Sequence, residues 1–480
     1  MVLWDYSRLI TNMKRWSFKS KMLRAQEESL KLLPAKAQDP TVLRTLILPS
    51  EVETFAMLAI KEKEWTSKEI KDNEFKRAIE TIRTYRHPKL FEKKGEEFGK
   101  WAVILVSATQ FDFQFNPIYK INRYISYFDY VDDIINMPKE IKNKFGIHYR
   151  EIVAPIILLW MHYSGDGFRL LPKQMEWLFK KYSKTIDLLT LTRDEYIKEL
   201  DEITSKIEDY MYCHRPSYSW PFVMCENNRY MPTPHLLVRA VTESLFHRLT
   251  FGNNKLREKI GKCVLESYLY RLICKSDEFQ EIIPEQEYQK GQKTLDVMAS
   301  CDENIICFDS KSFVPQIGIR TFDPLAYKNT INRIVEIFIQ AYKHIRYKFG
   351  VKYKYLSVPI KDDRSNIYAI VVLADNPFCP IDEIHLSAAR ELNIPIPSEE
   401  YDWLRGHVGI ADVDAMEIQI LQRKGFINAV TKNSCTKQYS DHWFTQGEII
   451  EDDKKTEYME DNVTNLVYTV IDAMKDDGVI

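Results

Sequence analysis

The sequence predicts an α+β protein that is mainly helical, with a small mixed sheet in its second half. Glycine is scarce, at 15 of 480 residues, and apolar residues recur at helical spacing along much of the chain. Short apolar runs typical of strands gather between residues 279 and 374. Because 480 residues exceed one typical domain of about 100–200, we expect a helical domain over 1–250, an α/β core over 251–400, and a helical extension with an acidic tail over 401–480.

Composition narrows the classes of protein that fit. The chain is 45% hydrophobic and 12% aromatic, enough for a large core, and its net charge is only −2. Any phosphate-binding surface must therefore be local. Eight cysteines without a close CxxC pair indicate free thiols, and the N-terminus lacks the pattern of a signal peptide. The apolar runs are shorter than the ~18 residues of a membrane helix, so we expect a cytoplasmic protein with no membrane partner.

The first elements are predicted to be helices. The basic stretch 14–24 carries Trp16 and Phe18, and we interpret it as a solvated helix face with docked aromatics rather than a nucleic-acid contact. Ser50-Glu-Val-Glu53 fits a capping box that opens a helix. The aromatic-rich run 111–130 indicates irregular structure or short strands. Further helical patterns cover 74–85, 96–109 and 149–163.

The rest of the first half continues in the same way. We expect a helix over 194–212, a proline-bounded hairpin-like insert over 215–232, and a helix over 236–249. Cys213, His214 and Cys225 lack the paired spacing of zinc ligands, so they do not predict a zinc site. For the helical half as a whole we expect a role in sensing, protein interaction or substrate binding.

The stretch from Thr294 to Lys311 carries the chemistry. Its two apolar runs predict a β-hairpin that turns at Asp302 and Glu303. This register sets Asp296 opposite Asp309, with Cβ atoms about 4.5–5.5 Å apart. Lys311 follows Asp309 by two residues and so shares its face. Because neighbouring carboxylates repel unless a cation lies between them, this grouping favours a divalent-metal site.

Helices and strands follow the hairpin. Asp323-Pro324 predicts the start of a long helix with an apolar stripe from Ile331 to Ile345, and we expect its Gln340 and Lys343 to be exposed. Further expected elements are strands over 355–359 and 368–374, helices over 382–392 and 412–422, a mobile acidic segment over 448–461, and a closing helix over 462–474.

Asp296, a hairpin, and then Asp309-Ser310-Lys311 resemble the signature of the PD-(D/E)XK nuclease superfamily. A preceding helix with Glu266 and a strand over 279–288 fit the family order, and the resemblance covers residues of about 255–375. Leu295 stands where the family often has proline, and Asp309 where it often has glutamate. The resemblance implies a restriction-endonuclease-like core with Asp296, Asp309, Lys311 and Glu266 as catalytic residues. It also implies Mg²⁺ or Mn²⁺ held by Asp296, Asp309, Glu266 and the main-chain carbonyl of Ser310.

The function implied is metal-dependent hydrolysis of phosphodiester bonds, with DNA as the expected nucleic acid. A helical half fused to such a core resembles prokaryotic restriction and anti-phage defence effectors, with a protein partner or a second copy bound through the helical half. Three alternatives stay open: a catalytically inactive nuclease fold acting as a sensor or scaffold, an RNA-directed nuclease, and a nuclease that cuts transposon ends. A structural alternative for Glu266 is an ion pair with Arg271 or Lys262.

Overall fold

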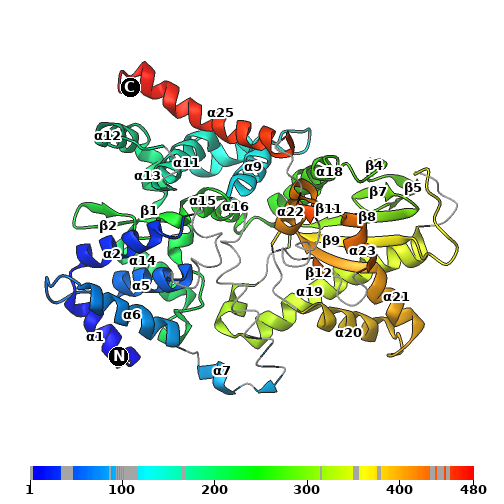
Figure 1. Cartoon of the computed structure of the whole chain (residues 1–480), viewed down its shortest axis with the longest axis horizontal. Coiled ribbons are helices and arrows are strands. Elements are labelled where there is room, and N and C mark those ends of the chain that lie inside the picture. The colour runs from blue at the N-terminus through cyan, green and yellow to red at the C-terminus, as the bar shows by residue number, and fades with distance from the viewer. Residues whose placement is uncertain are drawn as a thin grey trace.

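Figure 1 shows a computed structural model of the chain. It describes residues 4–33, 47–85, 88–92, 94–95, 97, 99, 101, 117–164, 168–313, 316–349, 356–375, 380–432, 438–439, 448–449 and 454–480. The mainly helical α+β class is confirmed, because helices predominate and the sheets are small.

A six-stranded mixed sheet forms the centre of the second half. Its strand order is β12-β10-β9-β8-β7-β4. Neighbours β4, β7 and β8 run antiparallel, whereas β8, β9, β10 and β12 run parallel. The strand bounds are β4 Glu281–Pro284, β7 Val297–Cys301, β8 Asn304–Lys311, β9 Ile367–Leu373, β10 Val408–Asp412 and β12 Gln438–Tyr439.

Both faces of this sheet are buried, because β7, β8 and β9 are apolar at odd and even positions alike. Val297 and Phe308 belong to one hydrophobic core, which we name core 1. Met298 and Cys307, the next residues along each strand, belong to core 2. Parallel strands that are buried on both faces show this continuous apolar pattern. The sheet is therefore the middle layer of three (Figure 1).

Helices from different parts of the chain cover the two faces. Core 2 is closed by α19 (Pro324–Lys343), α20 (Ile381–Leu392) and α21 (Glu399–His407), and core 1 by α18 (Glu266–Ile273) and α22 (Val413–Gln422). Asp323 Oδ1 accepts a hydrogen bond from Leu325 N at 2.9 Å and so caps α19, as predicted. The predicted stripe of α19 is buried and its Gln340 and Lys343 are exposed, so both predictions are confirmed.

The first half is built from helices around one short three-stranded sheet of β1 (Thr190–Thr192), β2 (Phe222–Cys225) and β3 (Asn228–Tyr230). The β2–β3 hairpin confirms the insert predicted over 215–232. The helix predicted over 236–249 is broken at Thr242. The helix bounds are α1 Tyr6–Arg15, α2 Phe18–Leu30, α5 Pro49–Lys61, α6 Asp72–Thr84, α7 Pro88–Glu92, α9 Pro117–Phe128, α10 Met137–Phe145, α11 Tyr149–Ser164, α12 Pro172–Lys181, α13 Ser183–Leu188, α14 Arg193–Ile203, α15 Leu237–Val241, α16 Glu243–Thr250 and α17 Asn254–Lys259.

Two predictions for the first half are wrong. The described part of 111–130 is not irregular or strand-forming but contains helix α9, whose Tyr124 and Phe128 pack into core 1. The capping box predicted at Ser50 is displaced, because Pro49 already begins α5 and Glu51 Oε2 accepts the hydrogen bond from Leu48 N at 2.8 Å. The pattern predicted over 96–109 lies almost entirely outside the described residues.

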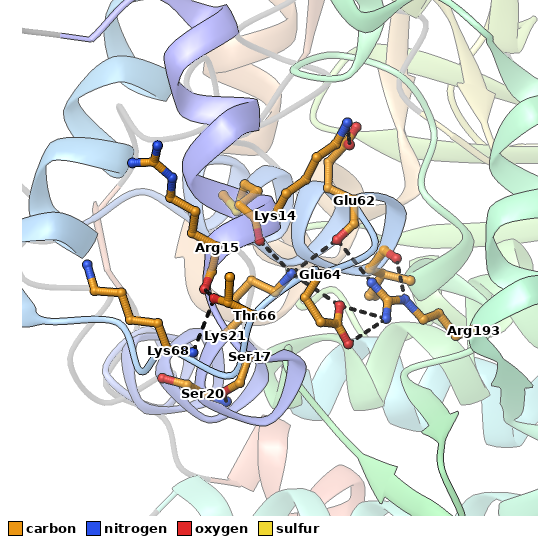
Figure 2. A network of polar contacts seen from close by, with 12 residues as sticks. Lys14, Arg15, Ser17, Ser20, Lys21, Glu62, Glu64, Thr66, Lys68 and Arg193 are labelled. Carbon is orange, nitrogen blue, oxygen red and sulfur yellow. Dashed lines mark hydrogen bonds and ion pairs between the residues drawn. The ribbon is translucent and has the colours of Figure 1, made fainter.

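The basic segment 14–24 is more deeply buried than expected. Trp16 and Phe18 are docked, as interpreted, but Lys21 is fully buried, so a solvated face is wrong there. Its Nζ donates to the carbonyl oxygens of Met13 at 2.9 Å and Glu62 at 3.2 Å (Figure 2). Burial lowers the pKa of Lys21 to about 8. This lysine therefore ties α1 and α2 to the chain after α5 and is not offered to nucleic acid.

The C-terminal segment joins both halves. The sheet crosses the boundary expected at residue 401, because β10 and β12 follow it. Helix α25 (Lys454–Asp476) begins earlier than the predicted 462, so 454–461 is helical, and the helix as a whole packs on α9 and α11. Residues 356–358 form no strand, contrary to the prediction over 355–359. None of the helices within the described residues combines the length and apolarity that crossing a bilayer requires.

Several smaller elements lie within the described residues. Core 1 also receives the π-helical turn η5 (Ile260–Leu265), which precedes α18 and packs against β8. The remaining elements are the 3₁₀ turns η2 Ile207–Asp209, η3 Pro216–Tyr218, η4 Pro234–Leu236 and η6 Ile317–Thr321, the π-helical turn η7 His344–Lys348, helix α23 Phe426–Lys432, and strands β5 Glu287–Gln289, β6 Gln292–Lys293, β11 Arg423–Lys424 and β13 Glu448–Ile449.

Candidate functional site

Acidic residues meet at one end of the central sheet. The hairpin turns at Asp302 and Glu303, as predicted, and pairs Val297 with Phe308. One further step of this register sets Asp296 opposite Asp309. On the other side of β7, Pro284 pairs with Val297, so the same step sets Glu285 opposite Asp296. Three neighbouring strands therefore present carboxylates side by side at the same edge.

Hydrogen bonds fix the two predicted aspartates. Ser310 donates to Asp296 Oδ2 twice, from its main-chain N and from its Oγ, both at 2.7 Å. Lys311 Nζ donates to Asp309 Oδ1 at 2.6 Å. These bonds leave Oδ1 of Asp296 and Oδ2 of Asp309 without a hydrogen-bond partner among the described residues. The structure thus brings Asp296, Asp309, Ser310 and Lys311 together.

Glu266 begins α18 and is half-buried. Burial raises the pKa of its carboxyl group to about 8, and the nearby charges of Asp296, Glu285 and Asp309 raise it further while Lys311 lowers it. The ion pairs with Arg271 or Lys262 that offered a structural explanation do not form within the described part of the chain, and Arg271 Nε donates to the carbonyl oxygen of Ser267 at 3.3 Å. Glu266 therefore faces the acids of the sheet edge and lacks a cation of its own.

The same repulsion acts on the two aspartates. Burial and the charge of Asp309 raise the pKa of Asp296 to about 6, although Lys311 and the Ser310 hydrogen bonds lower it. Burial also raises the pKa of Asp309, which Lys311 partly offsets. The pKa of Lys311 is raised by Asp309, Asp296 and Glu266 despite the burial that lowers it. At neutral pH Lys311 is thus a cation among carboxyl groups whose mutual repulsion it offsets only in part.

Sequence reasoning missed Glu285. This residue follows β4 directly, forms an ion pair with Lys293, and contributes to the raised pKa values of Glu266 and Asp309. The signal was present, since the acid follows the short apolar run Ile282-Ile-Pro284. Its position could be found only by extending the register from the hairpin to the preceding strand, β4. That pairing is not local, because the small β5–β6 hairpin lies between β4 and β7 in the sequence.

The donor set decides what kind of metal site these residues suit. Within the described residues, no group of three or more His, Cys, Asp or Glu side chains is arranged to hold a metal ion. Mg²⁺ does not need such a cage, because it keeps several waters and uses one or two carboxylates together with substrate phosphates. The free oxygens of Asp296 and Asp309 meet that requirement. The two aspartates therefore offer the kind of oxygen ligands that a loosely held, hard divalent cation prefers.

Comparison of the chain with models of protein families, with curated proteins and with solved structures found no match in any of the three.

Proposed function

We propose that this protein is a metal-dependent phosphodiesterase that cuts nucleic acid, with DNA as the expected substrate. The observation that carries the proposal is the in-register alignment of Asp296 with Asp309 at the end of a buried sheet, with Lys311 bonded to Asp309. The order α18, β4, β7, β8, α19 supports it, since this is the order that the resemblance to PD-(D/E)XK nucleases implies.

Each residue has a role that follows from its surroundings. Asp296 and Asp309 would hold Mg²⁺ through their free oxygens, with the main-chain carbonyl of Ser310 as a further ligand. When bound, the ion supplies charge neutralisation and makes a coordinated water more acidic. Because its neighbours raise the pKa of Lys311, its amine acts as a charged donor that orients water and counters negative charge on the phosphoryl oxygens. Glu266 positions water at the same edge.

The deciding experiment is a cleavage assay with Mg²⁺ on linear and circular duplex DNA, single-stranded DNA and RNA. We expect the parent protein to cut at least one of the DNA substrates, and Asp309→Asn and Lys311→Ala to lose about 10²-fold or more of that rate. Lys361→Ala is the matched control, because Lys361 also pairs with an acid of this hairpin, Glu303, at 2.6 Å but lies on the surface. Equal rates for all four proteins would exclude the proposed site.

Two alternatives give different results in related experiments. Cleavage of RNA alone would place the same chemistry on another substrate. A catalytically inactive nuclease fold used as a sensor or scaffold would cut nothing and would bind Mn²⁺ no better than Asp309→Asn does, as titration calorimetry would show. We also propose a role in defence, and a protein partner or a second copy bound to the helical half. Both proposals rest only on the similar domain arrangement of known defence effectors.

A further inference from the structure

A cavity of about 150 Å³ lies where the helical half meets the sheet. Residues of α9, α16, η5 and η6 line it, together with the residues that directly follow β8 and β9. Its walls combine the rings of Tyr124, Tyr127 and Phe246 with the charged side chains of four arginines and three acids. Such a mixture of an apolar wall and a few convergent polar groups is typical of ligand pockets.

Two of the three acids of the cavity form ion pairs with cations. Glu243 forms ion pairs with Lys120 and with Arg239 Nε, the latter at 3.4 Å, and these cations lower the pKa of Glu243 to about 2 although burial opposes the change. Asp414 Oδ1 lies 2.6 Å from Arg123 Nη2. Asp375 makes an interaction of its own and is not a free carboxylate. The cavity therefore has no surplus of negative charge to hold a cation.

Two of its arginines have no acidic partner. Arg320 and Arg257 form no ion pair and no side-chain hydrogen bond with any described residue, and Cζ of Arg320 lies 5.9 Å from the centroid of the Tyr218 ring. Nη1 of Arg320 is buried and unsatisfied, which is costly for a charged donor. His214 also lines the cavity, and burial together with the charges of Arg320 and Arg239 lowers its pKa, so it is neutral there. The unpaired charge in this cavity is positive.

The cavity adjoins the candidate site. Its lining includes Ser312, the residue after Lys311, and Ala374, whose N donates to the carbonyl oxygen of Lys311 at 2.9 Å. A small recess lined by Ser310 and Lys311 shares Ala374, Leu265 and Tyr127 with the cavity. A group held by the arginines would therefore lie next to the carboxylate end of the sheet.

We propose that this cavity binds a phosphate monoester, carried by a nucleic-acid strand end or by a free nucleotide. Guanidinium groups match phosphate oxygens with paired hydrogen bonds, and an aromatic wall suits a sugar or base. A volume of about 150 Å³ admits a phosphate with part of its sugar, and is smaller than the roughly 300–1,000 Å³ of a site for a drug-sized ligand. The link to strand ends rests on the proposed function, whereas the anion site does not.

The test measures binding without divalent metal, so that no strand is cut. The probes are a fluorescent oligonucleotide with a 5′-phosphate, the same strand with a 3′-phosphate, and the strand with neither. We expect one phosphorylated strand to bind about tenfold more tightly, and Arg320→Ala and Arg257→Ala to remove that preference. Arg333→Ala is the matched control, because it removes an equal charge from the exposed face of α19.

Competition identifies the source of the phosphate. If thymidine 5′-monophosphate displaces the strand and thymidine does not, the cavity serves free nucleotides too; if neither competes, it serves strand ends. Equal binding of all three strands, or the same loss in Arg333→Ala as in Arg320→Ala, overturns the inference. Binding that keeps its phosphate preference in a protein without nuclease activity would support this inference while the proposed function fails. Cleavage of DNA by a protein that shows no phosphate preference would support the proposed function and contradict this inference.

Discussion

At the scale of the residue, the decisive feature is a shortage of positive charge. Glu266, Glu285, Asp296 and Asp309 influence one another, while Lys311 and Lys293 are the cations bonded to them. Carboxyl groups kept together in this way hold protons more tightly than they would in water. A divalent cation would displace those protons and relieve the repulsion. The site can therefore be examined by counting protons, without any assay of activity.

The first such prediction concerns metal binding. Mn²⁺ binding at pH 7 should release protons, because Glu266 with a pKa of about 8 is largely protonated beforehand and Asp296 with a pKa of about 6 partly so. Titration calorimetry in buffers of different ionisation enthalpy measures the number released. Glu266→Gln should release fewer protons and still bind Mn²⁺. A proton release that is unchanged in this variant would remove Glu266 from the site.

The second concerns stability of the metal-free protein. The folded-state pKa of Glu266 is raised from 4.5 to about 8, so the folded chain binds this proton more tightly than the unfolded chain does. Its contribution is present below pH 4.5 and is lost as the pH rises through about 8. The Tm of the parent should therefore fall by about 1–2 °C more than that of Glu266→Gln between pH 5 and 8.5, a small effect because water screens this half-exposed group. An identical decline would contradict the prediction.

The residues of the site that could be predicted from the sequence are those that lie close together along the chain. Asp296, Asp309 and Lys311 could be placed because one hairpin turn and period-2 alternation determine their relation. Glu266 came from the expected order of elements. Glu285 could not be placed, because its position depends on how β4 pairs with a strand beyond an intervening excursion. Nor could the arginines of the cavity, since Arg257 and Arg320 come from segments on either side of the hairpin and meet only in the folded chain.

At the scale of the element, the spacing of apolar residues predicted which face of a helix is buried in the core. The stripe of α19 was legible because Ile331, Ile334 and Phe338 repeat every three or four residues and all reach core 2. The prediction for 111–130 was wrong at α9 because tyrosine, phenylalanine and isoleucine favour strands intrinsically, whereas their spacing in this segment is helical. Its rings in fact pack against α16 and α18, through Phe246 and Tyr268. Tertiary contacts outweighed propensity there.

The third prediction tests the layer behind the site. Phe338 is fully buried in the middle of α19, against the face of the sheet. Phe338→Ala should lower the free energy of unfolding by about 3–5 kcal/mol, because it removes a large apolar side chain and leaves a cavity. Chemical denaturation measures the loss. Gln340→Ala, on the exposed face of the same helix, should change stability by less than about 0.5 kcal/mol. Comparable losses in both would mean that α19 does not pack as described.

At the scale of the whole molecule, the two halves share one core. Core 1 contains residues of α9 and α11 from the first half, of α18 and β7 from the second, and of α25 from the C-terminal segment. A buried ionic network reinforces this junction. Arg123 of α9 lies 2.6 Å from Asp414 and 3.2 Å from Glu417 of α22, and Tyr268 of α18 donates to Glu417. The helical half is thus part of the structure that holds the candidate site.

This shared core leads to the last prediction, at Val470 of α25. Val470 is fully buried where α25 packs on α9 and α11, so an aspartate there would place an unpaired charge in core 1 and cost about 3 kcal/mol or more. We expect Val470→Asp to accelerate amide hydrogen exchange in β8 as well as in α11, because side chains of both elements pack in core 1. Mass spectrometry resolves the two segments.

Tyr468→Asp provides the control, since Tyr468 is half-exposed two residues away on the same helix and should leave both exchange rates unchanged. Faster exchange confined to α25 and α11 would show that the sheet keeps its stability without the helical half. Asp296, Asp309 and Lys311 would then belong to a unit that folds by itself. The domain boundary expected near residue 250 would then separate two parts of the chain that unfold independently. Coupled exchange would instead mean that disturbing the helical half reaches the sheet edge through their common core.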